Sequence, residues 1–218
     1  NADNVDLESF ARYFLVEDFS GNQDFIFNSF YLFKERADNK FYFGPVWDFD
    51  LAFDNAQILY PTNEKKNFSY KFGLSNGSMN KLISQLLAIP QVLQKVKDTW
   101  NEMTNTKFTK EIIRNFLNKQ IELINESQKL NFMKWDVLNS RQFMEAATRG
   151  SFEAEVNYLK EFVENRFDVF GNLVSSATTE SVLEETQGSW GFPWGGGNNP
   201  WGGNGDNPWG GNGDNPWG

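Results

Sequence analysis

The chain has 218 residues and a net charge of −9, and it contains neither cysteine nor histidine. These absences exclude disulfide bonds, Cys/His zinc sites and every catalytic arrangement that needs a thiolate or a histidine base. The acidic charge argues against nucleic-acid binding, which depends on a basic surface. Any chemistry must therefore use carboxylates, amides, hydroxyls, lysine, arginine or a hard metal ion.

The composition divides the chain into a folded domain at 1–174 and a tail at 175–218. The tail holds 12 of the 18 glycines and five of the eight tryptophans, and an eight-residue repeat starts at Asn199, Asn207 and Asn215. So much glycine leaves too little apolar area to offset chain entropy, so we expect a disordered Gly/Trp-rich tail. Two interpretations stay open: a plain low-complexity segment, or an aromatic array that contacts glycan, cell wall or a coat protein.

The domain begins with the pattern of an amphipathic helix. Asp6 is placed to cap it and Gly21 to end it, and one face is apolar, formed by Leu7, Phe10, Ala11, Phe14 and Leu15. Two aromatic-rich runs, 29–34 and 40–43, flank the turn residues at 37–39 and predict a β-hairpin. Gly44 and Pro45 then break the second strand.

Helical periodicity dominates the chain after residue 77. Helix starts are predicted at Ser78, Pro90 and Phe152, and a long helix is predicted directly after Thr109. A further short helix is expected around 132–137, and Gly171 is expected to end the last helix. The expected fold class is therefore α+β and mostly helical, with one hairpin.

Polar side chains gather at the outer ends of this hairpin. Asp24 and Asn28 come just before the first strand, and Asp48 and Asp50 just after the second. A hairpin brings its outer ends together, so the four side chains are expected to converge. Oxygen ligands of this kind suit Mg²⁺ or Mn²⁺, which also binds phosphate oxygens. The order of residues parallels the phosphoryl-transfer template, in which carboxylates and an amide position the hydroxyl and the metal.

Each of these residues also has a purely structural interpretation. Asp24 could form an Asx turn after the helix, Asn28 could be a turn residue, and Asp50 could cap the following segment. Asp48 is harder to explain in this way because large apolar residues flank it.

The sequence resembles the spore-coat protein H (CotH) kinase family over about residues 4–172. The motifs that carry the resemblance are Phe10-Ala11-Arg12-Tyr13-Phe14, Gly21-Asn22-Gln23-Asp24, Asn28-Ser29-Phe30-Tyr31-Leu32-Phe33, Phe41-Tyr42-Phe43-Gly44-Pro45-Val46-Trp47-Asp48-Phe49-Asp50, and the final helix from Phe152 to Phe162 with Arg166.

The resemblance implies an atypical protein kinase fold that uses ATP and Mg²⁺ or Mn²⁺ to phosphorylate Ser or Thr. Asp24 resembles the catalytic aspartate, Asn28 and Asp48 resemble the residues that bind metal and nucleotide, and Asp50 is a candidate second metal ligand. The chain would correspond to the C-terminal lobe. The lysine and glutamate of the N-terminal lobe are expected before residue 1, so this stretch alone is expected to be inactive.

The resemblance also implies a partner and a location. The expected substrate is a Ser/Thr-rich coat or surface protein, and the expected location is extracellular, on the cell surface or in the spore coat. We expect no nucleic-acid partner and no membrane span.

Two other functions stay open. The chain could be a non-catalytic kinase-like scaffold attached through the Trp-Gly tail, or a metal-dependent hydrolase that uses the same oxygen ligands. The hydrolase ranks last because no water-activating base is evident.

Overall fold

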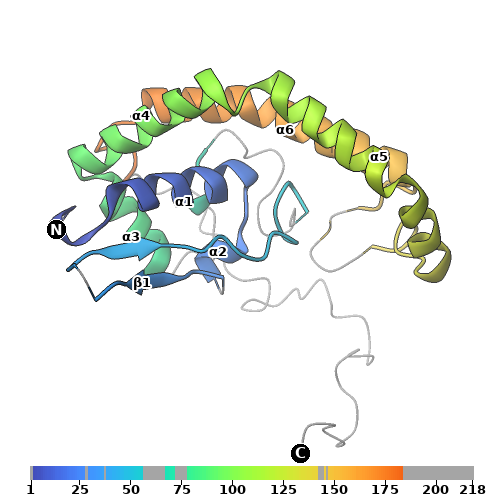
Figure 1. The fold of residues 1–218 in the computed structure, drawn as a ribbon, viewed down its shortest axis with the longest axis horizontal. Helices are drawn as coiled ribbons and strands as arrows, with labels where there is room; N and C mark the ends of the chain where they lie inside the picture. The colour runs from blue at the N-terminus through green and yellow to red at the C-terminus, as the bar shows by residue number, and fades with distance from the viewer. Residues whose placement is uncertain are drawn as a thin grey trace, which may run out of the picture.

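The structure is a computed structural model that describes residues 2–27, 29–36, 38–55, 67–71, 78–141, 145 and 147–183. Figure 1 shows the elements in chain order: η1 (Ala2–Asn4), α1 (Leu7–Ser20), α2 (Asp24–Phe27), β1 (Leu32–Lys34), β2 (Phe41–Phe43), η3 (Ser69–Lys71), α3 (Ser78–Leu87), α4 (Pro90–Thr106), α5 (Lys110–Lys134) and α6 (Phe152–Ser176). The prediction of a mostly helical α+β fold with one hairpin is confirmed. Within the described residues, no helix combines the length and apolar character needed to cross a bilayer.

Helix α1 is the centre of the fold, between the hairpin on one side and α4 and α6 on the other (Figure 1). The Asp6 side chain caps its start by accepting from Ser9 N at 2.8 Å, and Gly21 ends it with a φ of 64°. The apolar face predicted from the sequence is buried, with Phe10, Ala11 and Phe14 fully inaccessible. Burying these side chains supplies most of the driving force that holds α1 between its neighbours.

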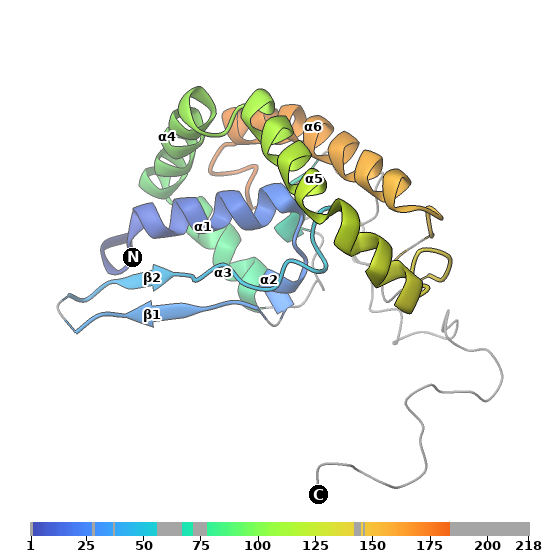
Figure 2. The same cartoon turned by 45° about the vertical axis from the view of Figure 1, so that its right-hand side comes forward.

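The hairpin is attached to the start of α1 (Figure 2). Its strands are antiparallel and pair Leu32 with Phe43, and they are shorter than the runs predicted from the sequence. The Phe43 ring packs edge-on against Phe10, with centroids 4.9 Å apart, and Phe43 N donates to Ser9 Oγ at 3.2 Å. The outer ends of the two strands are therefore held beside α1.

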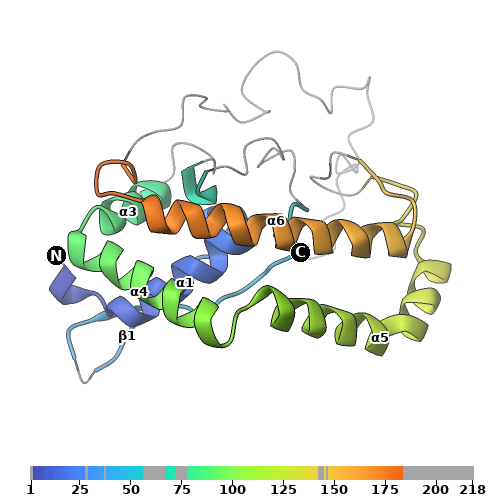
Figure 3. The same cartoon turned by 90° about the horizontal axis from the view of Figure 1, so that it is seen from above.

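Helices α5 and α6 lie side by side (Figure 3), and two of their details correct the sequence predictions. The short helix expected around 132–137 does not form separately, because α5 continues to Lys134 and Trp135 is extended. Gly171 does not end the last helix, which continues to Ser176. The buried Phe170 and Val174 on either side of Gly171 explain this, since their packing outweighs the weak helix propensity of glycine.

Packed residues continue beyond 174, where the composition changes. Val182 is only 1 % exposed, and its carbonyl accepts from Tyr70 Oη at 2.8 Å. The segment after α6 therefore folds back onto η3. The predicted tail from residue 184 onward lies outside the described residues.

Candidate functional site

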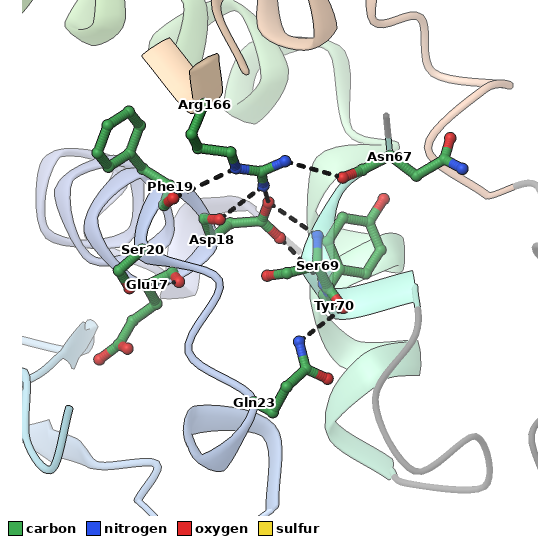
Figure 4. A network of polar contacts seen from close by, with 9 residues as sticks. All are labelled: Glu17, Asp18, Phe19, Ser20, Gln23, Asn67, Ser69, Tyr70 and Arg166. Carbon is green, nitrogen blue, oxygen red and sulfur yellow. Dashed lines mark hydrogen bonds and ion pairs between the residues drawn. The ribbon is translucent and has the colours of Figure 1, made fainter. Parts of the chain in front are cut away.

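A buried ion pair between Asp18 and Arg166 lies at the C-terminal end of α1 (Figure 4). Both side chains are inaccessible to solvent, and Arg166 Nη2 donates to Asp18 Oδ1 at 3.1 Å. The backbone N–H groups of Ser69 and Tyr70 donate to the same carboxylate, each at 3.0 Å. Burial raises the pKa of Asp18, and Arg166 and the two N–H groups act in the opposite direction. The carboxylate is satisfied entirely by the protein.

Arg166 also binds three backbone carbonyls. It donates to Phe19 O at 3.2 Å, to Asn67 O at 3.2 Å and to Asp18 O at 2.8 Å. A cation is favourable at a helix C-terminus, where the carbonyls lack partners within the helix. Arg166 therefore joins α1, the segment before η3 and α6, and this junction supports the loop that follows α1.

The loop between α1 and α2 is anchored residue by residue. Gly21 reverses the chain in the left-handed region, which glycine adopts without a steric cost. Gln23 is 3 % exposed, and its Nε2 donates to Ser69 O at 3.4 Å (Figure 4). Asp24, which begins α2, is thereby held at a defined place relative to the buried ion pair.

Asn22 is the most connected residue of this loop. Its Nδ2 donates to Glu17 Oε2 at 2.9 Å and to the backbone oxygen of Asp48 at 3.1 Å. Its Oδ1 accepts from Asp24 N at 3.1 Å. One buried amide thus links the end of α1 to both aspartates that the sequence proposes for the site.

Glu17 supports this amide from the core. Its side chain is inaccessible to solvent, and burial raises its pKa to about 7, with the Asn22 hydrogen bond lowering the pKa and the Asp24 charge raising it further. Its second oxygen, Oε1, has no hydrogen-bond partner among the described residues.

The segment after β2 folds tightly around Asp48. Asp48 has a φ of 61°, a left-handed conformation that is uncommon for a residue other than glycine. Its carbonyl is held by Asn22, and farther on Phe53 N donates to Ser20 O at 2.7 Å. These contacts attach both ends of the segment to the C-terminal end of α1, so the Asp48 conformation is imposed by its surroundings.

Three of the four predicted site residues are close together. Partial desolvation raises the pKa of the exposed Asp48 carboxyl, and so do the charge of Asp50, a hydrogen bond with Asp50 and the charge of Asp24. The fourth residue, Asn28, lies outside the described residues. The three aspartates thus lie near enough for their charges to interact at the outer ends of the hairpin, here called the hairpin mouth, while the roles of all four residues stay predictions.

Asp24 has a further neighbour that the sequence did not indicate. Ser29 is 3 % exposed; its Oγ donates to Asp24 Oδ2 and its N–H donates to Asp24 O at 3.0 Å. This contact orients one carboxylate oxygen of Asp24.

Glu17 and Asn22 were also missed as site residues. Asn22 belongs to the quoted Gly-Asn-Gln-Asp motif without an assigned role. Glu17 follows Phe10 by seven residues and Phe14 by three, so it falls on the apolar face of α1. A carboxyl side chain on this otherwise apolar face of α1 is the sequence feature that could have indicated a role for Glu17.

Two of the carboxylates at the hairpin mouth are of the kind that contributes to a divalent-cation site. Within the described residues, no group of three or more acidic side chains could hold a metal ion by itself. Mg²⁺ does not need one, because it usually binds one or two carboxylates and completes its shell with water and substrate phosphates. The exposed Asp48 and its neighbour Asp50 could supply such carboxylates, and a cation would relieve the repulsion that raises the pKa of Asp48.

A comparison with protein families assigns the chain to a class. The family model described as CotH kinase protein matches residues 2–170, which is most of the described part, and places the chain among kinase-like proteins. The chain belongs to the CotH kinase family, as the resemblance predicted. Searches of curated proteins and of solved structures give no match.

Proposed function

We propose that the full-length protein is a metal-dependent protein kinase that transfers the γ-phosphate of ATP to Ser or Thr of a secreted, coat or surface protein. The observation that supports this function best is the meeting of Asp24, Asp48 and Asp50 at one hairpin mouth in a member of the CotH kinase family. Phosphoryl transfer depends on positioning and charge neutralisation, so the lack of histidine is no obstacle.

The position of each residue determines the role that we assign to it. Asp24, partly exposed at the start of α2, orients the attacking hydroxyl and accepts its proton. Asp48 and Asn28 would hold the divalent metal that binds the ATP phosphates, and Asp50 would supply a second carboxylate beside Asp48. The bound Mg²⁺ or Mn²⁺ neutralises charge on the phosphates.

Asp24→Asn separates transfer from binding. In full-length protein with Mn²⁺ and labelled ATP, we expect transfer to fall by about 10²-fold or more, because the carboxylate is lost as acceptor. Nucleotide binding should persist, because Asp48 and Asn28 are intact. The matched control is Asp98→Asn, which removes an exposed carboxylate on α4 and should leave transfer unchanged. Undiminished transfer by Asp24→Asn would move the catalytic role to another residue.

The tryptophan repeat supports a second candidate, a non-catalytic scaffold that the tail attaches to glycan or cell wall. Five tryptophans in a glycine-rich stretch offer indoles that can stack on sugar rings. If wild-type full-length protein binds no nucleotide while residues 184–218 bind cell-wall polysaccharide, the scaffold function is supported and the kinase function is excluded.

A further inference from the structure

We propose that Glu17 is a positioning residue of this site: from the core it fixes the Asn22 side-chain amide, which in turn sets the distance between Asp24 and Asp48. This inference rests on the proposed function, since it concerns the geometry of the same site. As a positioning residue, Glu17 itself touches neither substrate nor metal.

The geometry of the Asn22 amide carries the first step. The amide nitrogen donates to Glu17 Oε2 and to Asp48 O, and the amide oxygen accepts from Asp24 N, so both ends of the amide are engaged. The side chain is inaccessible to solvent, so water cannot replace a lost partner without opening the core. Each contact therefore constrains the other two.

Glu17 is the contact that determines which way the amide points. Without its acceptor, one buried N–H of Asn22 would lose its partner and keep the full penalty of its desolvation. The amide would relieve that cost by rotating, and rotation would break its bonds to Asp24 and Asp48. A displacement of about 1 Å at reacting groups can reduce a rate by roughly 10²-fold.

Stability alone does not explain a carboxyl at this position. Glu17 is fully buried and its pKa is raised to about 7, which reflects the unfavourable transfer of its charged form out of water. An apolar side chain of the same size would avoid that cost on the apolar face of α1. What the carboxyl adds is the hydrogen bond to Asn22, and through it the link between the two aspartates.

The decisive variant is Glu17→Met, which keeps the volume and removes the acceptor. In full-length protein we expect a melting temperature close to that of the wild type, because removing the buried carboxyl offsets the hydrogen bonds that Asn22 loses. We expect Mn²⁺·ATP binding to weaken about 10-fold by calorimetry, and phosphoryl transfer to fall about 10²-fold with an unchanged KM for the protein substrate. Glu17→Gln retains an acceptor oxygen and should recover most of both losses.

A binding readout on the metal alone accompanies the activity. Water-proton relaxation with Mn²⁺ alone should show weaker binding in Glu17→Met than in Glu17→Gln. The control is Glu8→Gln, at an exposed acid on the same helix, which pairs with Arg12 and Lys95 and should match the wild type.

A double-mutant cycle keeps the proposal falsifiable if Glu17→Met folds poorly. Asn22→Ala removes the bridge while leaving Glu17, and the double variant should lose no more Mn²⁺·ATP affinity than Asn22→Ala alone. Additive losses would mean that Glu17 does not act through Asn22, and the proposal fails.

The two possible failures are distinct. If wild-type protein binds Mn²⁺·ATP and Glu17→Met binds and transfers equally well, the positioning role is overturned and the kinase stands. If wild-type protein binds no nucleotide at any metal concentration, the proposed function is wrong and the positioning role falls with it.

Discussion

Two aspartates near the end of α1 have opposite surroundings. Asp18 is inaccessible to solvent and receives donors from Arg166, Ser69 and Tyr70. Asp48 is exposed, and its pKa is raised by partial desolvation and by the carboxylates of Asp50 and Asp24. The first carboxylate is satisfied by the protein and holds α1, η3 and α6 together. The second is surrounded by like charge, so a cation from solution would stabilise it.

The largest expected effect is on the buried pair. Arg166→Ala leaves the Asp18 carboxylate uncompensated and removes the donor to Phe19 O, so we expect the free energy of unfolding to fall by about 3–5 kcal/mol. Urea unfolding of the chain measures it. The matched control is Arg12→Ala, which breaks the exposed pair with Glu8 and should cost less than about 1 kcal/mol. Equal costs for the two variants would show that Arg166 is not the junction described above.

The next effect in size is the pH dependence due to Glu17. Its folded-state pKa of about 7 lies above its ordinary value of 4.5, so the folded protein keeps a proton that the unfolded chain loses between these values. This contribution is complete below about pH 4.5 and is lost as the pH rises through 7, with a total of about 3 kcal/mol at most. The groups acting on this carboxyl are Asn22 and Asp24, and its own charge raises the pKa of Tyr13.

Unfolding measured at several pH values tests this contribution. Glu17→Gln should lack the decline in stability between pH 4.5 and 7 that we expect of the wild type. A decline of the same size in both proteins would assign it to another group.

The smallest expected effect is on the pKa of the exposed Asp48 carboxyl at the hairpin mouth. Asp50→Asn removes a charge that raises the pKa of Asp48, so that pKa should move down toward its ordinary range. Carboxyl ¹³C chemical shifts followed through a pH titration report it. Asp38→Asn, at a partly exposed acid in the hairpin turn, serves as the control and should leave the pKa of Asp48 unchanged. An unaltered Asp48 in Asp50→Asn would mean that the two carboxylates do not interact.

Local patterns predicted much of the fold because they depend on short-range chemistry. Asp6 and Gly21 bound α1 as capping residues should, and Pro90 and Thr109 stand at the starts of α4 and α5 as expected. Gly171 failed as a helix end because the packing of Phe170 against Trp100 of α4 and against Phe68 is not visible in local propensity. The change in composition at 174 likewise gives no sign that Val182 returns to the core.

The part of the site that chain topology brings together was predicted from the sequence. The part that a buried hydrogen-bond network brings together was missed. The hairpin places Asp24 and Asp48 at one mouth, and the sequence indicates this without tertiary detail. Asn22 and Glu17 become significant only when the Asp48 carbonyl is seen to approach from 26 residues away. A pattern of residue types carries no information about such an approach.

The central claim is that the exposed carboxylates form the metal end of a nucleotide site. Calorimetry of ATP binding to the full-length protein, with and without Mn²⁺, tests it most directly in the wild type, in Asp48→Ala and in the α4 control Asp98→Ala. We expect metal-dependent binding in the wild type and the control, and its loss in Asp48→Ala with an unchanged melting temperature. Binding that survives Asp48→Ala, or a wild type that binds no ATP at millimolar concentration, would contradict the claim.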